Sequence, residues 1–307
     1  MTAAERPILV LDSASLYYRS FHALPESMVA PDGRPHNALR GFLSTVTRLV
    51  TAHSPASVVA CWDNDWRPQW RVDLVPTYKA HRVADASTGV EAEPESLSAQ
   101  AEAIADVLEA AGIARLGFDG FEADDVIGSL AAQDPHPSIA VSGDRDLVQI
   151  VDARTRLLLT VNGGMDKWPL LDPAAVLERF GVPADRYVDL AVLRGDPSDG
   201  LPGVPGIGVK TAANLVNAFD GLEGIARAAA DTPDHRPMTP RLAAAVTSAG
   251  AVIAAAEQVA RVRTDLPVLD RASHLDRPRL DDLAQQWGVQ RQVSDLMSAL
   301  ARHTADE

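Results

Sequence analysis

Cysteine is nearly absent from this sequence. Cys61 is the only cysteine in 307 residues, which excludes a disulfide within the chain and fits a reducing compartment. No apolar run approaches the ~20 residues that a membrane-spanning helix needs. The first seven residues are polar and lack the apolar centre of a secretory signal. We therefore expect a cytoplasmic protein that does not enter a membrane.

An excess of positive charge is also absent. The formal net charge is −14, and nucleic-acid-binding proteins usually carry a basic surface, so charge argues at first sight against a nucleic-acid partner. This objection weakens if many acids gather at one place, where divalent metals would neutralise them. An acidic surface that only aids solubility is the other interpretation, and charge alone does not decide between them.

Strand-like and helix-like segments alternate in the first half of the chain. The apolar runs 7–12 and 57–63 read as buried strands, and the spacing of apolar residues in 37–52 predicts a helix between them. Ser13 or Ser15 is expected to cap the helix after the first strand. The remaining elements expected here are helices at 96–111 and 126–132 and strands at 138–142 and 157–161. This alternation predicts an α/β fold around a mostly parallel sheet.

Helices take over near residue 170. A helix is expected between Asp172-Pro173 and Gly181. Further helices are expected at 186–194, 212–219, 239–262 and, as two short ones, within 279–303. We expect a core over 1–170, a helical subdomain over 171–263 and C-terminal helices over 264–307 that pack back on the core. Residues 64–95 are expected to leave the core as a mobile excursion.

Acidic residues recur where these elements begin or end. They are Asp12, Asp63, Glu122, Asp124, Asp125, Asp144, Asp146, Asp196 and Asp199. The carboxyl ends of parallel strands line one crevice, so we expect these side chains to converge and to require cations. Oxygen-only ligands favour Mg²⁺ or Mn²⁺, and two such ions ~4 Å apart can activate water and stabilise the leaving oxygen of a phosphodiester. Any one of these acids could instead be a turn or cap residue; the set favours metals.

A glycine-rich string follows the last acids. It runs Gly203-Val-Pro-Gly206-Ile207-Gly208-Val-Lys210-Thr211, and glycines at this spacing let a turn between helices approach a phosphate. A Walker A loop needs Gly directly before Lys and a strand before it, whereas Val209 intervenes here and a helix precedes. The string therefore predicts a helix–hairpin–helix that binds a nucleic-acid backbone. A plain helical connection is the alternative.

A basic and aromatic group lies at the start of the excursion. Lys79 and Arg82 would share a face and bind a phosphate, and Tyr78 could stack on a base. An exposed basic turn without function is the alternative. Arg19 is a weaker candidate. The tryptophans Trp62, Trp66 and Trp70 are more often core residues than ligand platforms.

These motifs, taken together and in order, resemble the bacterial 5′ nucleases, relatives of flap endonucleases and of the 5′–3′ exonuclease domain of DNA polymerase I. The similarity covers about residues 8 to 263. The matching stretches are Leu9–Asp12 with Tyr18–His22, Trp62–Asp63, Tyr78–Arg82, Glu122–Asp125, Ser142–Asp146, Gly195–Asp199 and Gly203–Thr211.

The resemblance implies a PIN-like nuclease core, with an arch or clamp at about 64–97, and a helix–hairpin–helix in the helical subdomain. It implies a first metal held by Asp12, Asp63, Glu122 and Asp124, and a second held by Asp144, Asp146, Asp196 and Asp199, with Asp125 between them and two or three ions in all. Lys79 and Arg82, with Tyr78 and Arg19 nearby, would act on the scissile phosphate. The turn Gly203–Gly208, with Ile207, Lys210 and Thr211, would grip the duplex and hold K⁺.

The sequence departs from the family pattern in three places. Residues 83–95 are acidic and lack a compact Met-Pro continuation. The loop after Asp199 reads Gly200-Leu-Pro where the family has Asn-Ile-Pro. No polymerase domain follows, so a free-standing nuclease is expected. Its second group of acids is intact, which favours activity.

We therefore expect a monomeric, metal-dependent 5′ nuclease that cuts flapped, gapped or nicked DNA, including RNA-primed 5′ ends, in primer removal and repair. No Ser/His or Cys/His nucleophile pair is evident, so no covalent intermediate is expected. A flap-DNA-binding protein without activity and a PIN-type ribonuclease are the alternatives. A nucleotide-binding protein of the P-loop kind is a remote third.

Overall fold

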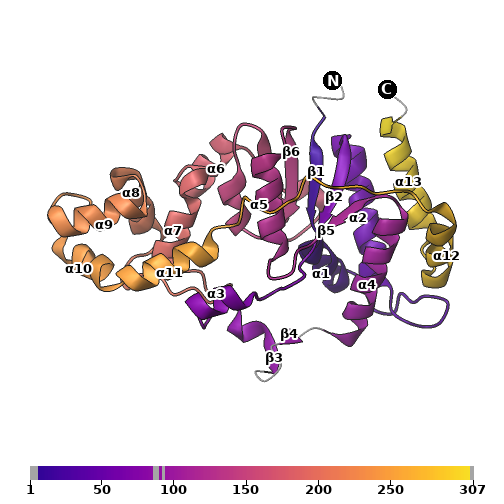
Figure 1. Ribbon diagram of the computed structural model, residues 1–307, viewed down its shortest axis with the longest axis horizontal. Helices are drawn as coiled ribbons and strands as arrows, with labels where there is room; N and C mark the ends of the chain where they lie inside the picture. The colour runs from indigo at the N-terminus through magenta and orange to yellow at the C-terminus, as the bar shows by residue number, and fades with distance from the viewer. Residues whose placement is uncertain (1–5, 86–89, 92–93, 305–307) are drawn as a thin grey trace.

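A six-stranded sheet forms the centre of the first half of the chain (Figure 1). The computed structural model describes residues 6–85, 90–91 and 94–304. The strand order is β5-β2-β1-β6-β7-β8, and neighbouring strands are parallel except β7 with β8. The strands are β1 (Ile8–Asp12), β2 (Ser57–Cys61), β5 (Ala114–Leu116), β6 (Ser138–Ser142), β7 (Thr155–Leu159) and β8 (Leu170–Leu171). The predicted mostly parallel sheet is confirmed.

Alternating side chains of β1 reach two different cores. Leu9 and Leu11 pack in one apolar cluster, whereas Ile8 and Val10 pack in the other, as the pleat of a strand buried on both faces requires. The first cluster is covered by α1 (Ser13–Ala23), α2 (Asn37–His53), α4 (Glu95–Ala110), α12 (Arg277–Trp287) and α13 (Gln290–Thr304). The second lies under α5 (Ala123–Gln133) and continues into the helical half. Thus α12 and α13 pack against α4 and α2.

The helical half extends to one side of the sheet (Figure 1). It contains α6 (Pro173–Phe180), α7 (Tyr187–Arg194), α8 (Val209–Phe219), α9 (Leu222–Asp231), α10 (Pro240–Ser248) and α11 (Gly250–Ala260). Asp172 caps α6 and Gly181 ends it in the left-handed region, as predicted. The predicted single stretch 239–262 is two helices instead. In the described residues no single helix has the length and apolarity to cross a membrane; α10 and α11 meet these criteria only as a pair, bent by 66°.

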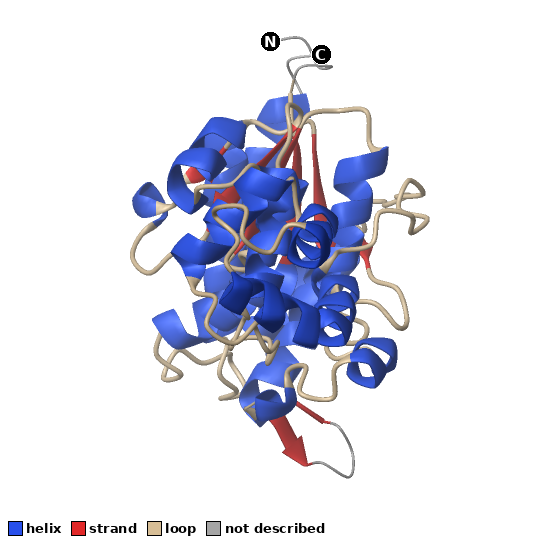
Figure 2. Ribbon diagram, turned by 90° about the vertical axis from the view of Figure 1, so that its left-hand side faces the viewer, coloured by secondary structure: helices blue, strands red, loops and turns tan. Residues whose placement is uncertain are grey.

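Two local predictions are wrong. The cap of α1 is Asp12, whose carboxylate accepts the Ser15 N–H, so neither Ser13 nor Ser15 is the cap. The start of the expected excursion is not mobile but packed, because α3 (Gln69–Leu74) lies against α11. Beyond it, a 3-10 helix η2 (Ala80–Arg82) leads into the hairpin of β3 (Val83–Asp85) and β4 (Val90–Glu91), which projects below the body (Figure 2). Residues 86–89 and 92–93, part of the predicted arch, lie outside the described residues.

A buried ion cluster joins α3, α5 and the end of α11. Arg71 is only 2% exposed. Its guanidinium donates to both oxygens of Asp125 at 2.8 and 2.9 Å, to Glu122, and to the Val259 carbonyl at 3.0 Å. A cation buried among two carboxylates removes charge that would otherwise be costly in the interior. The cluster therefore fixes α3 to the two helices beside it.

Replacing Arg71 should test how much stability this cluster provides. Arg71→Met leaves the buried carboxylate of Asp125 without a cation and Glu122 with Lys79 alone, so we expect the free energy of unfolding to fall by about 3–5 kcal/mol. Urea unfolding monitored by circular dichroism measures this. Arg277→Met is the matched control, because Arg277 and Asp281 form an exposed pair on α12, and it should change stability by no more than about 0.5 kcal/mol. Similar losses in both variants would contradict a special role for Arg71.

Replacing Gly128 in α5 by alanine should destabilise the protein, although alanine normally favours a helix more than glycine does. A Cβ there would lie 2.5 Å from Val262 Cγ2 and 2.7 Å from the Arg263 carbonyl oxygen. Gly→Ala in a helix usually stabilises by about 1 kcal/mol, but overpacking should make Gly128→Ala destabilising by about 1–3 kcal/mol in the same unfolding experiment. The control is Gly250→Ala, where a Cβ meets nothing within 4 Å and no loss is expected. An unfolding midpoint of Gly128→Ala at or above wild type would refute the close packing.

Candidate active site

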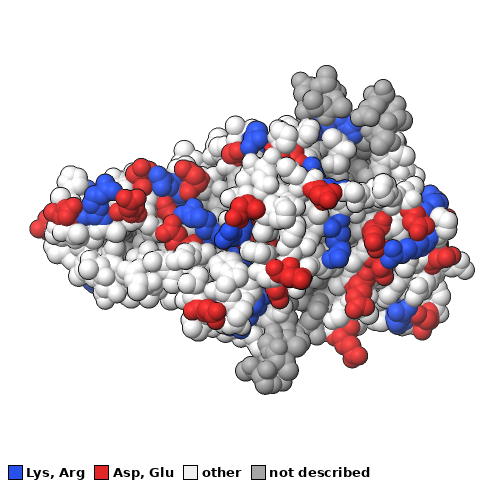
Figure 3. Space-filling model, viewed as in Figure 1, with Lys and Arg blue, Asp and Glu red and all other residues white. Residues whose placement is uncertain are grey.

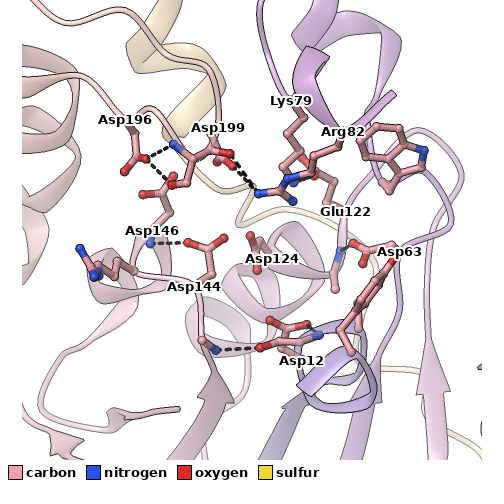
Figure 4. A pocket seen from close by; sticks show the side chains of 18 of the residues that line it. Asp12, Asp63, Lys79, Arg82, Glu122, Asp124, Asp144, Asp146, Asp196 and Asp199 are labelled. Atoms are coloured by element: carbon pink, nitrogen blue, oxygen red, sulfur yellow. Dashed lines mark hydrogen bonds and ion pairs between the residues drawn. The ribbon is translucent and has the colours of Figure 1, made fainter. Parts of the chain in front are cut away.

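A cavity of about 1280 Å³ opens beyond the carboxyl ends of β1, β2 and β6. Eight of the nine predicted acids line it, and Figure 4 shows them turned toward one another across this space. They are Asp12, Asp63, Glu122, Asp124, Asp144, Asp146, Asp196 and Asp199. The register of the sheet explains their meeting, because Val10 lies beside both Val59 and Ala140, so the strands end together. The predicted convergence therefore occurs for these eight.

Backbone and hydroxyl donors fix the acids that follow the strands. Asp12 accepts hydrogen bonds from the Ser15 N–H at 3.1 Å and from the Ser142 hydroxyl. Asp63 accepts the N–H of Ala123, the first residue of α5, at 2.7 Å. Asp144 accepts the N–H of Asp146 at 2.8 Å.

The turn after α7 positions the last two acids of the cavity. Asp196 accepts the Ser198 N–H at 2.9 Å, and its carbonyl oxygen accepts the Asp199 N–H at 3.3 Å. The segment from Asp196 to Asp199 is a turn and not a helix. Asp199 is nevertheless buried and reaches the same cavity as Asp196.

The acids are close enough to oppose one another's ionisation. Burial, reinforced by Asp63 and Asp144, raises the pKa of Asp12 to about 7. Burial and the charge of Asp144 raise the pKa of Asp124 and of Asp146 well above the usual range. Burial likewise raises the pKa of Asp199 to about 6, although Lys79 opposes the shift. A fully ionised cluster therefore needs additional positive charge.

Four cationic side chains line the same cavity, and three of them form ion pairs with its acids. Lys79 pairs with Glu122, and Arg82 approaches Asp199 at 3.3 Å, as Figure 4 shows. Arg194 pairs with Asp196 at 3.0 Å. The positive charge of Lys79 also lowers the pKa values of Asp124, Asp146 and Asp199 relative to what burial alone would give. The structure thus brings both predicted basic residues, Lys79 and Arg82, to the cavity.

Asp125 does not line the cavity, which corrects its prediction as a metal ligand. Its side chain is fully buried. One oxygen accepts from Arg71 and from the Arg263 N–H, and the other accepts from Arg71 and from the Glu122 N–H. With both oxygens engaged inside the protein, Asp125 holds Arg71 and the start of α5 in place.

Tyr78 and Arg19 also differ from their predictions. Tyr78 is 4% exposed and its hydroxyl donates to Glu122 at 2.7 Å, so its ring offers no face to a base. Arg19 donates to the carbonyl of Gly163 at 2.9 Å and to that of Val161, and its guanidinium lies over the Trp168 ring. It is not among the residues that line the cavity.

The predicted hairpin is a tight turn that leads into α8. Gly206 has φ +83°, and a Cβ on Gly203 would lie 2.3 Å from the Arg194 carbonyl oxygen, so both positions need glycine. Gly208 caps α8 with its backbone open to solvent, and Lys210 is exposed in the first turn, followed by Thr211. Ile207 is 4% exposed and its side chain packs in the core.

Residues outside the prediction also line the cavity. They include Trp66, which was expected in the core, and Asn64, Arg145 and Arg194. All four are close in sequence to a predicted acid, and this proximity could have identified them. Asn64 and Trp66 follow Asp63 closely. Arg145 lies between two acids, and Arg194 lies two residues before Asp196. The acid nearest to Arg71 in the sequence is Asp73, which is not one of the nine predicted acids, so Arg71 carried no such signal.

Comparisons with known proteins agree with this architecture. Residues 7–181 match the family described as 5′-3′ exonuclease, N-terminal resolvase-like domain, and residues 182–282 match 5′-3′ exonuclease, C-terminal SAM fold. A 5′-3′ exonuclease of Streptomyces coelicolor is 48% identical over 95% of this chain and 99% of its own length. A 5′-3′ exonuclease of Mycobacterium tuberculosis is 46% identical over 96% of this chain and 98% of its own.

A solved structure shares the fold at low sequence identity. The phage T5 5′-exonuclease with bound zinc superposes with a TM-score of 0.64 at 16% identity, covering 97% of this chain and 99% of that one. The two family models together span most of the sequence, and the two curated relatives match nearly all of it. This chain therefore belongs to the 5′–3′ exonuclease family.

Proposed function

We propose that this member of the family is a divalent-metal-dependent 5′ nuclease that hydrolyses phosphodiester bonds of flapped, gapped or nicked DNA. The observation that carries the proposal is one cavity lined by eight carboxylates together with Lys79 and Arg82. Such a cavity can hold hard cations and still bind the phosphate that they act on. The relatives named 5′-3′ exonuclease support the same class of reaction.

The acids fit divalent ions by their chemistry. They supply only oxygen donors, and several have pKa values raised by burial and mutual repulsion, which bound cations would reverse. We assign Asp12, Asp63, Glu122 and Asp124 to one Mg²⁺ or Mn²⁺ ion and Asp144, Asp146, Asp196 and Asp199 to a second. When bound, such ions lower the pKa of water and neutralise the charge that develops on the phosphate.

Filling these sites requires rearrangement. Among the residues that the structure describes, no three acidic, histidine or cysteine side chains form a set that could hold an ion as it stands. Both oxygens of Glu122 are engaged, one by Lys79 and the other by Arg71 and Tyr78. Mg²⁺ usually keeps several waters and uses few carboxylates, so side-chain rotation and water would complete each shell in this proposal.

The residues of the chain have distinct tasks in this mechanism. Lys79 and Arg82 bind and orient oxygens of the scissile phosphate, as cations at a developing charge do. The turn Gly203–Gly208 and the first N–H groups of α8, which have no partner within the helix, bind the duplex backbone. Lys210 adds a positive charge there. No covalent intermediate with the protein forms.

Further parts of the proposal rest on the family resemblance or on composition. They are a K⁺ ion at the Gly203–Gly208 turn, action on RNA-primed 5′ ends in primer removal and repair, a monomeric state and a cytoplasmic location. The division into a core over 1–170, a helical subdomain over 171–263 and a C-terminal part over 264–307 also stays a prediction.

The first test is cleavage of a 5′-flap DNA labelled at the 3′ end of the flap strand. With Mn²⁺ or Mg²⁺ we expect cutting near the junction, and with EDTA none. Asp144→Asn should lower the rate at least about 100-fold, because Asp144 acts on four other acids and electrostatic contacts of this kind are worth about 10²–10³ in rate. Binding of the flap by this variant should persist in a gel-shift assay.

The same experiment separates the alternatives. If the flap DNA is retarded in the gel-shift assay but is not cut in any reaction, the protein binds flaps without cleaving them. Preferential cutting of single-stranded RNA would indicate a PIN-type ribonuclease. Full activity of Asp144→Asn would refute the metal-dependent mechanism.

A second prediction concerns the hairpin. Lys210→Ala should weaken duplex binding and reduce the slope of log Kd against log salt by about 1, because one phosphate contact is lost. Fluorescence anisotropy at several salt concentrations measures both quantities. Lys167→Ala is the control, since Lys167 is also exposed but lies outside the cavity and the hairpin. Equal slopes for wild type and Lys210→Ala would exclude this contact.

A further inference from the structure

Trp66 is a large aromatic side chain in the wall of an otherwise charged cavity. It lines the space together with Asp63, Lys79 and Arg82, and it is only partly buried. It belongs to none of the apolar clusters formed by the described residues. By contrast, Trp62 packs against the apolar cluster that contains Leu9 and Leu11. Trp66 therefore has no evident role in holding the fold together.

The side chains of both neighbours of Trp66 are anchored by hydrogen bonds. Asp65 accepts the Gly120 N–H at 2.6 Å. Arg67 donates to the Tyr78 carbonyl at 2.6 Å, which ties the loop to the basic segment. Anchors on both neighbours limit the positions that the indole can take. A ring held in this way loses little conformational freedom when it binds a ligand.

The other aromatic residues that line the cavity contact one another and not Trp66. Tyr17 and Tyr18 line the same cavity, but they stack on each other with centroids 5.3 Å apart, and Tyr17 also meets Trp62 at 5.8 Å. Trp66 makes no ring contact with the residues that the structure describes. The exposed part of the indole therefore offers an apolar face to the cavity that a ligand can cover.

We infer that Trp66 is a stacking platform for a base of the strand that is cut, next to the phosphate bound by Lys79 and Arg82. The inference rests on the proposed function, because it takes a nucleic-acid strand as the ligand of the cavity. Every base has a π-face, so stacking positions a nucleotide without selecting a sequence. A nuclease that recognises the form of its substrate needs a contact of this sort beside the reacting phosphate.

The test compares flap substrates that carry one abasic nucleotide at successive positions around the cut. For wild type we expect one position where loss of the base lowers kcat/KM about 5-fold or more, the scale of a single base–aromatic contact. Trp66→Leu should be slower by a similar factor on intact DNA and insensitive to the missing base at that position. Trp66→Phe, which keeps an aromatic face, should restore most of the sensitivity.

Trp70→Phe is the matched control. Trp70 lies four residues after Trp66, in α3, but its indole donates to the Gly120 carbonyl and it is not among the residues that line the cavity. This variant should respond to abasic positions as wild type does. Equal abasic sensitivity of wild type and Trp66→Leu at every position would overturn the inference.

A binding measurement keeps the inference separate from catalysis. Flap DNA with 2-aminopurine at the sensitive position, or at each position in turn, is titrated with protein in EDTA. Stacking on Trp66 should quench the probe with wild type and Trp66→Phe but not with Trp66→Leu. If wild type cuts no substrate but this pattern appears, the proposed activity fails and the platform stands. If wild type cuts the flap but quenching does not depend on Trp66, the platform fails and the activity stands.

Discussion

Repulsion among carboxylates at one edge of the sheet is the constraint on which the rest of this structure depends. Parallel strands that end together place Asp12 and Asp144 in the same space, and burial raises the cost of their charge. The surrounding residues reduce that cost without removing it. Lys79 lies inside the cavity, and Arg71 lies behind it against the same helix start. When all the acids of the cavity are ionised, their negative charge therefore exceeds the positive charge that Lys79 and Arg71 supply.

The acidic character of the chain follows from the same arrangement. Eight of its 42 acidic residues line one cavity. The net charge of the whole chain is therefore a poor guide to whether the rest of its surface can bind DNA. On the face shown in Figure 3, Lys and Arg lie among Asp and Glu rather than in a single basic patch. Backbone N–H groups at a glycine-rich turn are suited to such a surface, because they bind phosphate without adding formal charge.

The sequence pattern predicted which acids meet, because an apolar run that ends in Asp indicates a strand with the acid at its carboxyl end. Parallel strands place such acids at the same edge of the sheet. The pattern could not predict which way a side chain points from the first turn of a helix. Asp124 and Asp125 are adjacent in sequence, yet one lines the cavity and the other is buried with Arg71. The same limit applies to Ile207, whose burial depends on neighbours distant in the chain. The break at Ala249 was missed because the alanine-rich stretch that contains α11 has weak apolar periodicity.

Gly200 shows how closely the acidic turn and the basic segment are joined. It has φ +68°, and a Cβ there would lie 2.1 Å from the Thr77 carbonyl oxygen. Thr77 donates its hydroxyl to the Gly200 carbonyl at 2.7 Å, and the Lys79 N–H donates to the Asp199 carbonyl at 2.9 Å. The glycine that replaces the family's asparagine is therefore matched to this backbone contact. Positions 77 and 200, 123 residues apart, should have changed together in evolution, so a chimera that exchanges only one of the two segments would inherit a steric conflict.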